Sequence, residues 1–210
     1  MIVAAAAPDP LQHGWWLASR AAGAVALLLV TASTVLGLAM ALRPAWARRH
    51  APRLVTLHEQ LSLSALGAIA VHGVTLLGDR WLRPGLAGIA LPGAMSYRPL
   101  FTSLGVVAGW LLAVLGLSYY ARGRIGVRRW RALHRLVLLA YALAVVHTLG
   151  AGTDAVSAWL RVPLLASIPL VLGLFALRVV RRDPPNRKGI PPMSPRPARP
   201  ARRARAETAR

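Results

Sequence analysis

Long uncharged runs alternate with short basic segments along most of this chain. Five apolar runs are long enough to cross a bilayer as helices, at residues 21–42, 54–77, 99–121, 132–150 and 160–180. At about 1.5 Å per residue, the first run spans about 33 Å, against about 30 Å of hydrocarbon. A backbone in lipid must satisfy its own hydrogen bonds. The pattern therefore predicts an all-α fold, a polytopic membrane helical bundle of about five transmembrane helices over residues 21–180.

The segment before the first run differs from a secretory signal peptide. Residues 1–19 contain no basic residue, so the charged region that opens a signal peptide is missing. Trp15 and Trp16 lie where an interfacial aromatic belt is expected. We therefore expect a retained first helix that follows an extracytoplasmic segment at residues 1–20.

Composition narrows the class of protein further. Hydrophobic residues make up 56% of the chain, yet the formal net charge is +20. A disordered chain lacks this apolar content, and a nucleic-acid-binding protein would not have runs of this length without charge. We expect a lipid bilayer as partner and no nucleic acid. The absence of Cys excludes disulfides, iron–sulfur clusters and covalently attached c-type haem.

The basic residues also predict an orientation. If the five runs cross the membrane in turn, one side receives 5 of the 26 Lys and Arg residues and the other receives the remaining 21. The smaller group is Arg20, Arg80, Arg83, Arg98 and Arg161. The positive-inside rule then places the N-terminus outside and the C-terminus in the cytoplasm. The expected location is a bacterial-type cytoplasmic membrane, crossed several times.

The last segment, residues 181–210, is rich in Pro and Arg and has no apolar periodicity. This composition predicts a disordered, basic cytoplasmic tail. It could clamp anionic lipid or dock a partner, or it could act only as a charged anchor that enforces the topology.

Four of the six histidines fall inside predicted spans, where ionisable side chains are rare and usually functional. His58 and His72 lie in the second span, and His134 and His147 in the fourth. The two spans run parallel, so His58 and His134 are expected at one depth near the cytoplasm. His72 and His147 are expected about 20 Å further out. Two imidazoles from two helices at each level suit haem iron held axially by two histidines.

Other interpretations of these histidines fit less well. One zinc or copper site cannot use ligands about 20 Å apart, and only Glu59 could supplement either pair. Four core histidines satisfied by helix–helix hydrogen bonds remain an alternative. One observation argues against His134 and His147 lying on the same face of the fourth span. The 13-residue step between them rotates an ideal helix by about 220°. Local over-winding, or contacts on two sides of that helix, would be needed.

The surroundings are compatible with a flat cofactor. Ala65 lies midway between His58 and His72 at almost the same angle, and a small residue there leaves room for a macrocycle. Arg53, Arg131 and Arg135 lie within a turn or two of the inner pair. They are candidate contacts for haem propionates.

The paired spacing resembles the ferric reductase-like transmembrane domain, a superfamily that includes ferric reductases, the NADPH oxidases and the haem subunit of the bacterial methionine sulfoxide reductase system. The resemblance covers about residues 54–182 and includes the W-x-x-L-H pattern that ends at His134. It implies two b-type haems, one held by His58 with His134 and one by His72 with His147. The resemblance also implies the 13-residue step between His134 and His147. Many members have six spans, whereas five are predicted here.

The family's oxidases and eukaryotic reductases append flavin and nicotinamide domains, for which this sequence has no room. The resemblance therefore implies the haem subunit of an oxidoreductase. It would carry electrons from a cytoplasmic flavoprotein reductase or quinol to an extracytoplasmic acceptor, and flavin would come only through a partner. Two alternatives stay open: a single-haem variant, and a non-redox transporter or assembly factor whose histidines are structural.

Overall fold

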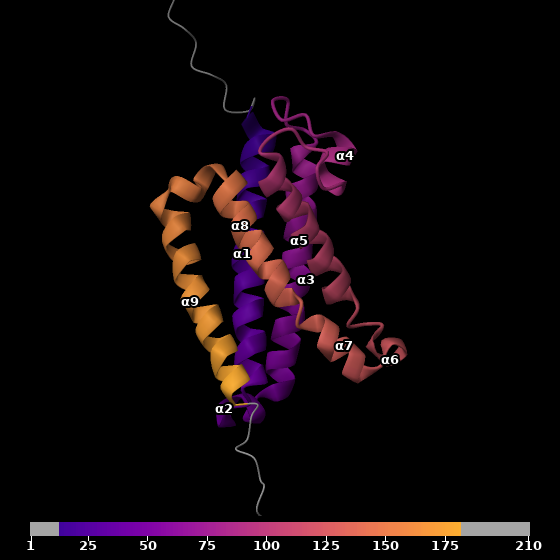
Figure 1. Cartoon of the computed structure of the whole chain (residues 1–210), viewed down its shortest axis with the longest axis vertical. Helices are drawn as coiled ribbons and strands as arrows, with labels where there is room; N and C mark the ends of the chain where they lie inside the picture. The colour runs from indigo at the N-terminus through magenta and orange to yellow at the C-terminus, as the bar shows by residue number, and fades with distance from the viewer. Residues whose placement is uncertain (1–12, 182–210) are drawn as a thin grey trace, which may run out of the picture.

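The computed structural model describes residues 13–181, so the predictions for residues 1–12 and for the tail from residue 182 onward lie outside the described residues. Within that range the fold is all-helical, as predicted, and five helical segments are long and apolar enough to cross a membrane. They are α1 (Gly14–Ala41), α3 (Ala51–Leu76), α5 (Pro99–Leu117), α7 with α8 (Val127–His134 and Val137–Ala151) and α9 (Ala158–Val180). The fourth segment is interrupted between α7 and α8 (Figure 1).

Short elements fill the connections between these segments. They are α2 (Ala45–Arg49), α4 (Gly85–Ala90), α6 (Arg122–Ile125) and the 3₁₀ helix η2 (Thr153–Val156). Helix α4 lies within the Gly- and Pro-rich loop between the second and third spans, where only a loop was expected. We call the end of the bundle that carries α2 and α6 the α2 end, and the opposite end, with α4 and η2, the α4 end (Figure 1).

The observed helix ends differ from the predicted ones for identifiable reasons. Helix α1 begins at Gly14 and so includes Arg20, whose guanidinium pairs with the Asp154 carboxylate. Helix α5 ends at Leu117, four residues early, in a turn that continues to Ala121. Helix α9 continues through both Pro163 and Pro169.

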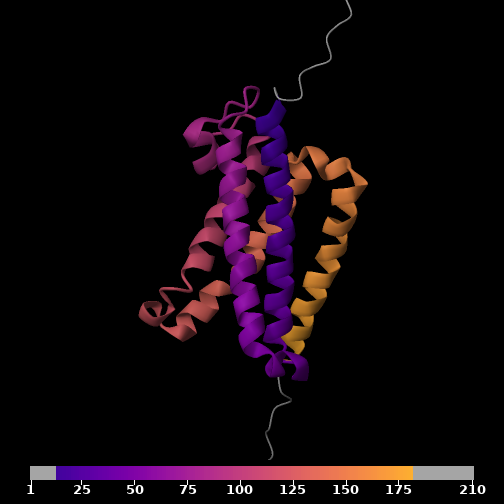
Figure 2. The same cartoon turned by 180° about the vertical axis from the view of Figure 1, so that it is seen from behind.

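Two antiparallel helix pairs form the centre of the bundle. Helix α1 packs along α3 and helix α5 packs along α8, while α9 lies against α1 (Figures 1 and 2). Helices α3 and α8, which carry the four histidines, face each other without close backbone packing. The fold thus leaves a slot between the two helices that carry the candidate ligands.

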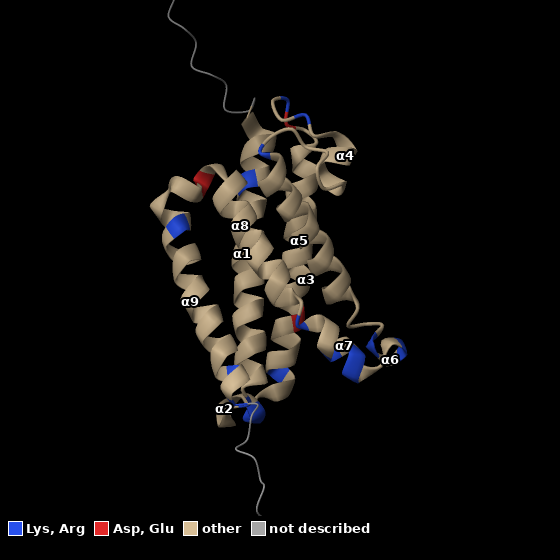
Figure 3. Ribbon diagram, in the orientation of Figure 1, with Lys and Arg blue, Asp and Glu red and all other residues tan. Residues whose placement is uncertain are grey.

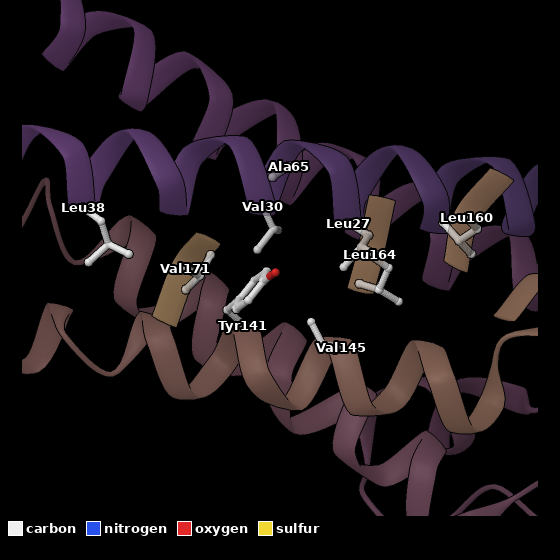
Figure 4. Packing of buried hydrophobic residues seen from close by; sticks show 9 residues of the cluster. All are labelled: Leu27, Val30, Leu38, Ala65, Tyr141, Val145, Leu160, Leu164 and Val171. Carbon is white, nitrogen blue, oxygen red and sulfur yellow. The ribbon is translucent and has the colours of Figure 1, made fainter. Parts of the chain in front are cut away.

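A compact apolar cluster fixes α9 and α8 on α1. Figure 4 shows its members, contributed mainly by those three helices: Leu27, Val30, Leu38, Ala65, Tyr141, Val145, Leu160, Leu164 and Val171. The Tyr141 hydroxyl is buried there and lies 2.6 Å from the Ser167 hydroxyl, which satisfies the polar tip of an otherwise apolar contact. This cluster lies on the side of α8 that faces α9.

The outer surface of the bundle is that of a membrane protein. Large apolar side chains face outward along every long helix, including Val114 at 63% and Leu172 at 60% exposed. Charged side chains gather at the two ends, with the densest group of Arg residues on α2, α6 and α7 (Figure 3). Apolar flanks with charged ends match a helical bundle that spans a bilayer.

Candidate functional site

The four intramembrane histidines meet in two pairs across the slot between α3 and the α7–α8 segment. The ring centroids of His58 and His134 are 6.3 Å apart, towards the α2 end. Those of His72 and His147 are 6.4 Å apart, towards the α4 end. The structure therefore brings together the same pairs of histidines that were predicted from their expected depth in the membrane. His13 and His50 are exposed and outside both pairs.

An interruption of the helix accommodates the 13-residue step from His134 to His147. The α-helical pattern stops after His134 and resumes at Val137. At this break the Leu136 amide bonds to the Leu133 carbonyl and the Leu138 amide to the Arg135 carbonyl, both over three residues instead of four. Tighter i→i−3 turns over-wind the chain. Figure 1 shows that the chain also changes direction between α7 and α8. Both histidines of this segment thereby pair with histidines of α3.

Helix α1 holds the ring of His72 through a serine. The Nδ1–H of His72 donates to the Ser19 carbonyl oxygen at 2.9 Å and also lies 3.0 Å from the Ser19 hydroxyl. That hydroxyl in turn donates to the His72 carbonyl oxygen at 3.2 Å. With Nδ1 as the protonated nitrogen, every donor in this group has an acceptor. The other ring nitrogen, Nε2, then keeps a free lone pair.

His58 is held in the same way one level down the bundle. Its Nδ1 lies 3.1 Å from both the Ser33 carbonyl oxygen and the Ser33 hydroxyl. The Ser33 hydroxyl is 2.8 Å from the Ser62 hydroxyl, which donates to the His58 carbonyl oxygen at 2.7 Å. This chain of hydrogen bonds again uses Nδ1 as donor and leaves Nε2 free.

The α1 residues that hold the two rings form a repeat with the same spacing as the histidines. Ser19 and Ser33 are fourteen residues apart, as are His58 and His72. Gly23 and Gly37 follow four residues after each serine, and a Cβ there would lie only 3.0 Å from His72 Nδ1 or 3.1 Å from His58 Cε1. Because α1 and α3 are antiparallel, equal steps along both helices bring each Ser-x-x-x-Gly unit to one imidazole. This repeat is a sequence signal that the spacing of the histidines alone does not reveal.

Helix α5 supplies the corresponding support for His147. The Nδ1–H of His147 donates to the Phe101 carbonyl oxygen at 2.9 Å. Gly105 follows four residues later, and a Cβ on Gly105 would lie 2.4 Å from that same nitrogen. The ring therefore occupies space that only glycine leaves open.

His134 is supported differently. Its Nδ1 is buried and has no hydrogen bond of ordinary geometry, although the Leu115 backbone interacts with the ring. Trp130, one turn earlier in α7, stacks on the imidazole with centroids 4.9 Å apart and planes 26° apart. The Trp130 indole N–H donates to the Ser118 hydroxyl at 3.1 Å.

Cavities accompany both pairs and share part of their lining. At the α4 end a cavity of about 750 Å³ includes His72 and His147, within the range of cofactor pockets. At the α2 end a much smaller cavity of about 50 Å³ includes His58 and His134. Small residues, among them Ala65 and Gly116, line the smaller cavity, and Ala108 and Gly109 line the larger one. Both cavities are predominantly apolar.

The imidazole spacing provides a test of whether haem iron fits between each pair. A metal–imidazole nitrogen bond is about 2.0 Å. A five-membered ring of bonds near 1.35 Å has a radius of about 1.15 Å, from standard bond lengths. Two rings on opposite sides of one metal ion would thus have centroids about 6.3 Å apart. The measured 6.3 Å and 6.4 Å agree, and Nδ1 hydrogen bonding leaves Nε2 available at three of the four rings. The residues present fit axial ligation.

The predicted propionate contacts lie at the surface of the α2 end. Arg53, Arg131 and Arg135 are all exposed. Their role towards a cofactor stays a prediction. Glu59, the only carboxylate expected near the inner pair, accepts a hydrogen bond from the Tyr120 hydroxyl at 2.6 Å. This bond holds the pKa of Tyr120, which lies beyond the end of α5, above its ordinary value.

Comparison with known families agrees with this architecture. The family model of the ferric reductase like transmembrane component matches residues 22–145. The chain belongs to this family. The match includes His58, His72 and His134 and ends two residues before His147. It also includes most of α1, which the sequence resemblance had left out. No solved structure matches the chain. Membership supports transmembrane electron transfer in general and a multi-pass membrane protein in particular.

Proposed function

We propose that this ferric reductase-like protein carries electrons across the membrane through two b-type haems. One would be held by His58 with His134 and the other by His72 with His147. The observation that carries the proposal is the paired imidazole spacing, 6.3 Å and 6.4 Å, at two levels of one slot. A transporter or assembly factor with structural histidines would not require two pairs of rings at the separation of axial ligands.

The chain's own residues orient the ligands and keep water away. The carbonyl oxygens of Ser19, Ser33 and Phe101 fix the tautomer of three imidazoles. They also raise the basicity of the free ring nitrogen as a metal ligand. Apolar side chains around the slot provide a low dielectric, which tunes the redox potential of a bound metal. When bound, haem supplies the one-electron chemistry, since none of these side chains is itself redox-active at ordinary potentials.

The direction of transfer follows from charge in the proposed orientation. The Arg-rich α2 end would face the cytoplasm, and the α4 end with its larger cavity would face outward. A cytoplasmic flavoprotein reductase, or quinol from the bilayer, would donate at the α2 end. The acceptor outside would be ferric iron, oxygen or a periplasmic partner protein. The membrane would be the bacterial-type cytoplasmic membrane.

Haem stoichiometry in single variants tests this proposal. Purified wild-type protein should show a b-type reduced-minus-oxidised spectrum and a pyridine haemochrome ratio near two. His58→Ala and His147→Ala should each lower that ratio to about one, because each removes one axial ligand from a different level. His50→Ala is the matched control, since His50 is exposed and its ring bonds to the Trp46 carbonyl of its own segment.

The alternatives give different results in the same measurement. A colourless preparation with normal folding would support a non-redox protein. A wild-type ratio near one would support the single-haem variant. An unchanged ratio in both His→Ala variants would refute the ligand assignment.

A further inference from the structure

Helix α7 has a basic side and an apolar side. At about 100° per residue, one side of the helix carries three exposed arginines, Arg128, Arg129 and Arg131. The other side carries Val127 and Leu133, which are 45% and 48% exposed although both are apolar. The helix is therefore amphipathic, and neither of its two sides is covered by the bundle.

The apolar side of α7 continues the lipid-facing surface of α8. Leu133 is followed at three-residue steps by Leu136 and Leu139, which are also exposed. At the break between the two helices the turns close over three residues, and such turns align side chains that are three apart. The exposed leucines thus form one stripe from α7 onto the flank of α8. Because that flank faces the bilayer, the partner of the apolar side is lipid.

The basic side of α7 belongs to a group of arginines that described carboxylates leave unbalanced. The exposed members of this group are Arg124, Arg128, Arg129, Arg131 and Arg135. In residues 13–181 the carboxylates are Glu59, Asp79 and Asp154, and none of them forms an ion pair with these arginines. Glu59 accepts the hydrogen bond from Tyr120, and the other two carboxylates lie at the α4 end. The group therefore suits an anionic partner from outside the described chain.

The position of α7 relative to the bilayer identifies that partner. Figure 1 shows α6 and α7 extending sideways from the bundle at the α2 end. A basic amphipathic helix in such a place lies in the membrane interface, with its apolar side towards the acyl chains and its cations among the headgroups. The Trp130 indole N–H donates to the Ser118 hydroxyl at 3.1 Å, which fixes α7 on the end of α5. Both sides of the helix thus keep their orientation towards the lipid.

We propose that α7 is an interfacial helix that binds the phosphate groups of anionic phospholipids through Arg128, Arg129 and Arg131. Val127 and Leu133 enter the acyl region beside it. A guanidinium group suits this role because its planar fork bonds phosphate oxygens in pairs. Each arginine near an anionic membrane surface contributes about fivefold to the binding. The inference goes beyond the proposed function and does not depend on haem.

A fluorophore on α7 in nanodiscs of defined composition tests the proposal. Ala132→Cys places a single cysteine at an exposed position of α7, in a chain that has no other cysteine. An environment-sensitive maleimide dye on this cysteine should change its emission, and the change should saturate, as phosphatidylglycerol replaces phosphatidylcholine. Adding Arg128→Gln and Arg129→Gln should raise the phosphatidylglycerol fraction at the midpoint at least about fivefold. Both arginines are exposed, so circular dichroism should show an unchanged helix content.

Arg80→Gln with Arg161→Gln is the matched control, because it removes the same charge from exposed positions at the α4 end. It should leave the midpoint unchanged. No response to phosphatidylglycerol, or an equal shift in the two double variants, would overturn the inference. A response to a polyglutamate peptide in phosphatidylcholine nanodiscs, without one to phosphatidylglycerol, would also overturn it and would assign the arginines to an acidic protein partner. The haem ratio tests the proposed function separately.

Discussion

At the scale of single residues, the glycines of α1 are as specifically required at their positions as the histidines that they face. A side chain at Gly23 would meet the His72 ring, with its Cβ 3.0 Å from Nδ1. We expect Gly23→Val to displace this ring from the Ser19 carbonyl and to weaken haem binding at the α4 end about 10- to 100-fold. The haem ratio of the purified protein should then fall from near two towards one.

Gly67→Val provides the matched control. Gly67 lies on α3, and a Cβ there has nothing within 4 Å. The same substitution therefore adds the same helix-propensity cost of valine without touching a candidate histidine ligand. Equal haem loss in the two variants would mean that valine acts through the helix itself, and would contradict the role given to Gly23.

The sequence predicted the histidines but not the residues that hold them. Imidazoles in an apolar helix are rare enough that four of them at paired depths indicate a function. Serine and glycine are common in membrane helices as packing residues, so Ser19 or Gly37 alone carries no such signal. The signal is their fourteen-residue repeat, which matches the step from His58 to His72, and it becomes meaningful only once α1 is known to pack on α3.

At the scale of helices, the interruption after His134 is what the sequence could not reveal. Breaks usually follow Pro or Gly, and neither lies between His134 and His147. Here two amides bond three residues back, and α7 leaves the axis of α8. The interruption is caused by tertiary contacts. Trp130 is hydrogen-bonded to Ser118 and stacked on His134, which fixes α7 at the end of α5.

A second tertiary contact joins α1 to the connection between α8 and α9. The Arg20 guanidinium forms two hydrogen bonds to the Asp154 carboxylate and lies 4.1 Å from the centre of the Trp16 ring. Arg20 follows Ser19, so this ion pair anchors the turn of α1 that holds His72. We expect Asp154→Asn to lower the free energy of unfolding by on the order of 1.5–3 kcal/mol, the usual contribution of a hydrogen bond to a charged group.

Thermal unfolding in detergent, followed by circular dichroism, measures this effect. Arg20→Gln should destabilise the protein similarly, and the double variant should lose less than the two single effects added together. Arg161→Gln is the control, because Arg161 is an exposed arginine in the first turn of α9. Strictly additive single effects would show that Arg20 and Asp154 are not coupled.

At the scale of the whole molecule, hydropathy predicted most of the architecture. All five expected spans exist, and their edges differ where a side chain or a turn decides them, as at Arg20 and Leu117. What hydropathy cannot give is which helices touch. The slot exists because α3 and α8 face each other while each packs on a different partner, and this arrangement determines where a flat cofactor would fit.

The orientation of the bundle is a prediction that the absence of cysteine makes easy to test. A single cysteine can be placed at each end without changing the charge: Leu86→Cys in α4, where the residue is 73% exposed, and Gly123→Cys in α6, where a Cβ has nothing within 4 Å. The positive-inside rule predicts that a membrane-impermeant maleimide labels Leu86→Cys in intact cells and labels Gly123→Cys only after permeabilisation. The reverse pattern would place the Arg-rich α2 end outside. Electrons would then have to enter the bundle through the α4 end, beside the larger cavity, and the order in which the two histidine pairs act would be inverted.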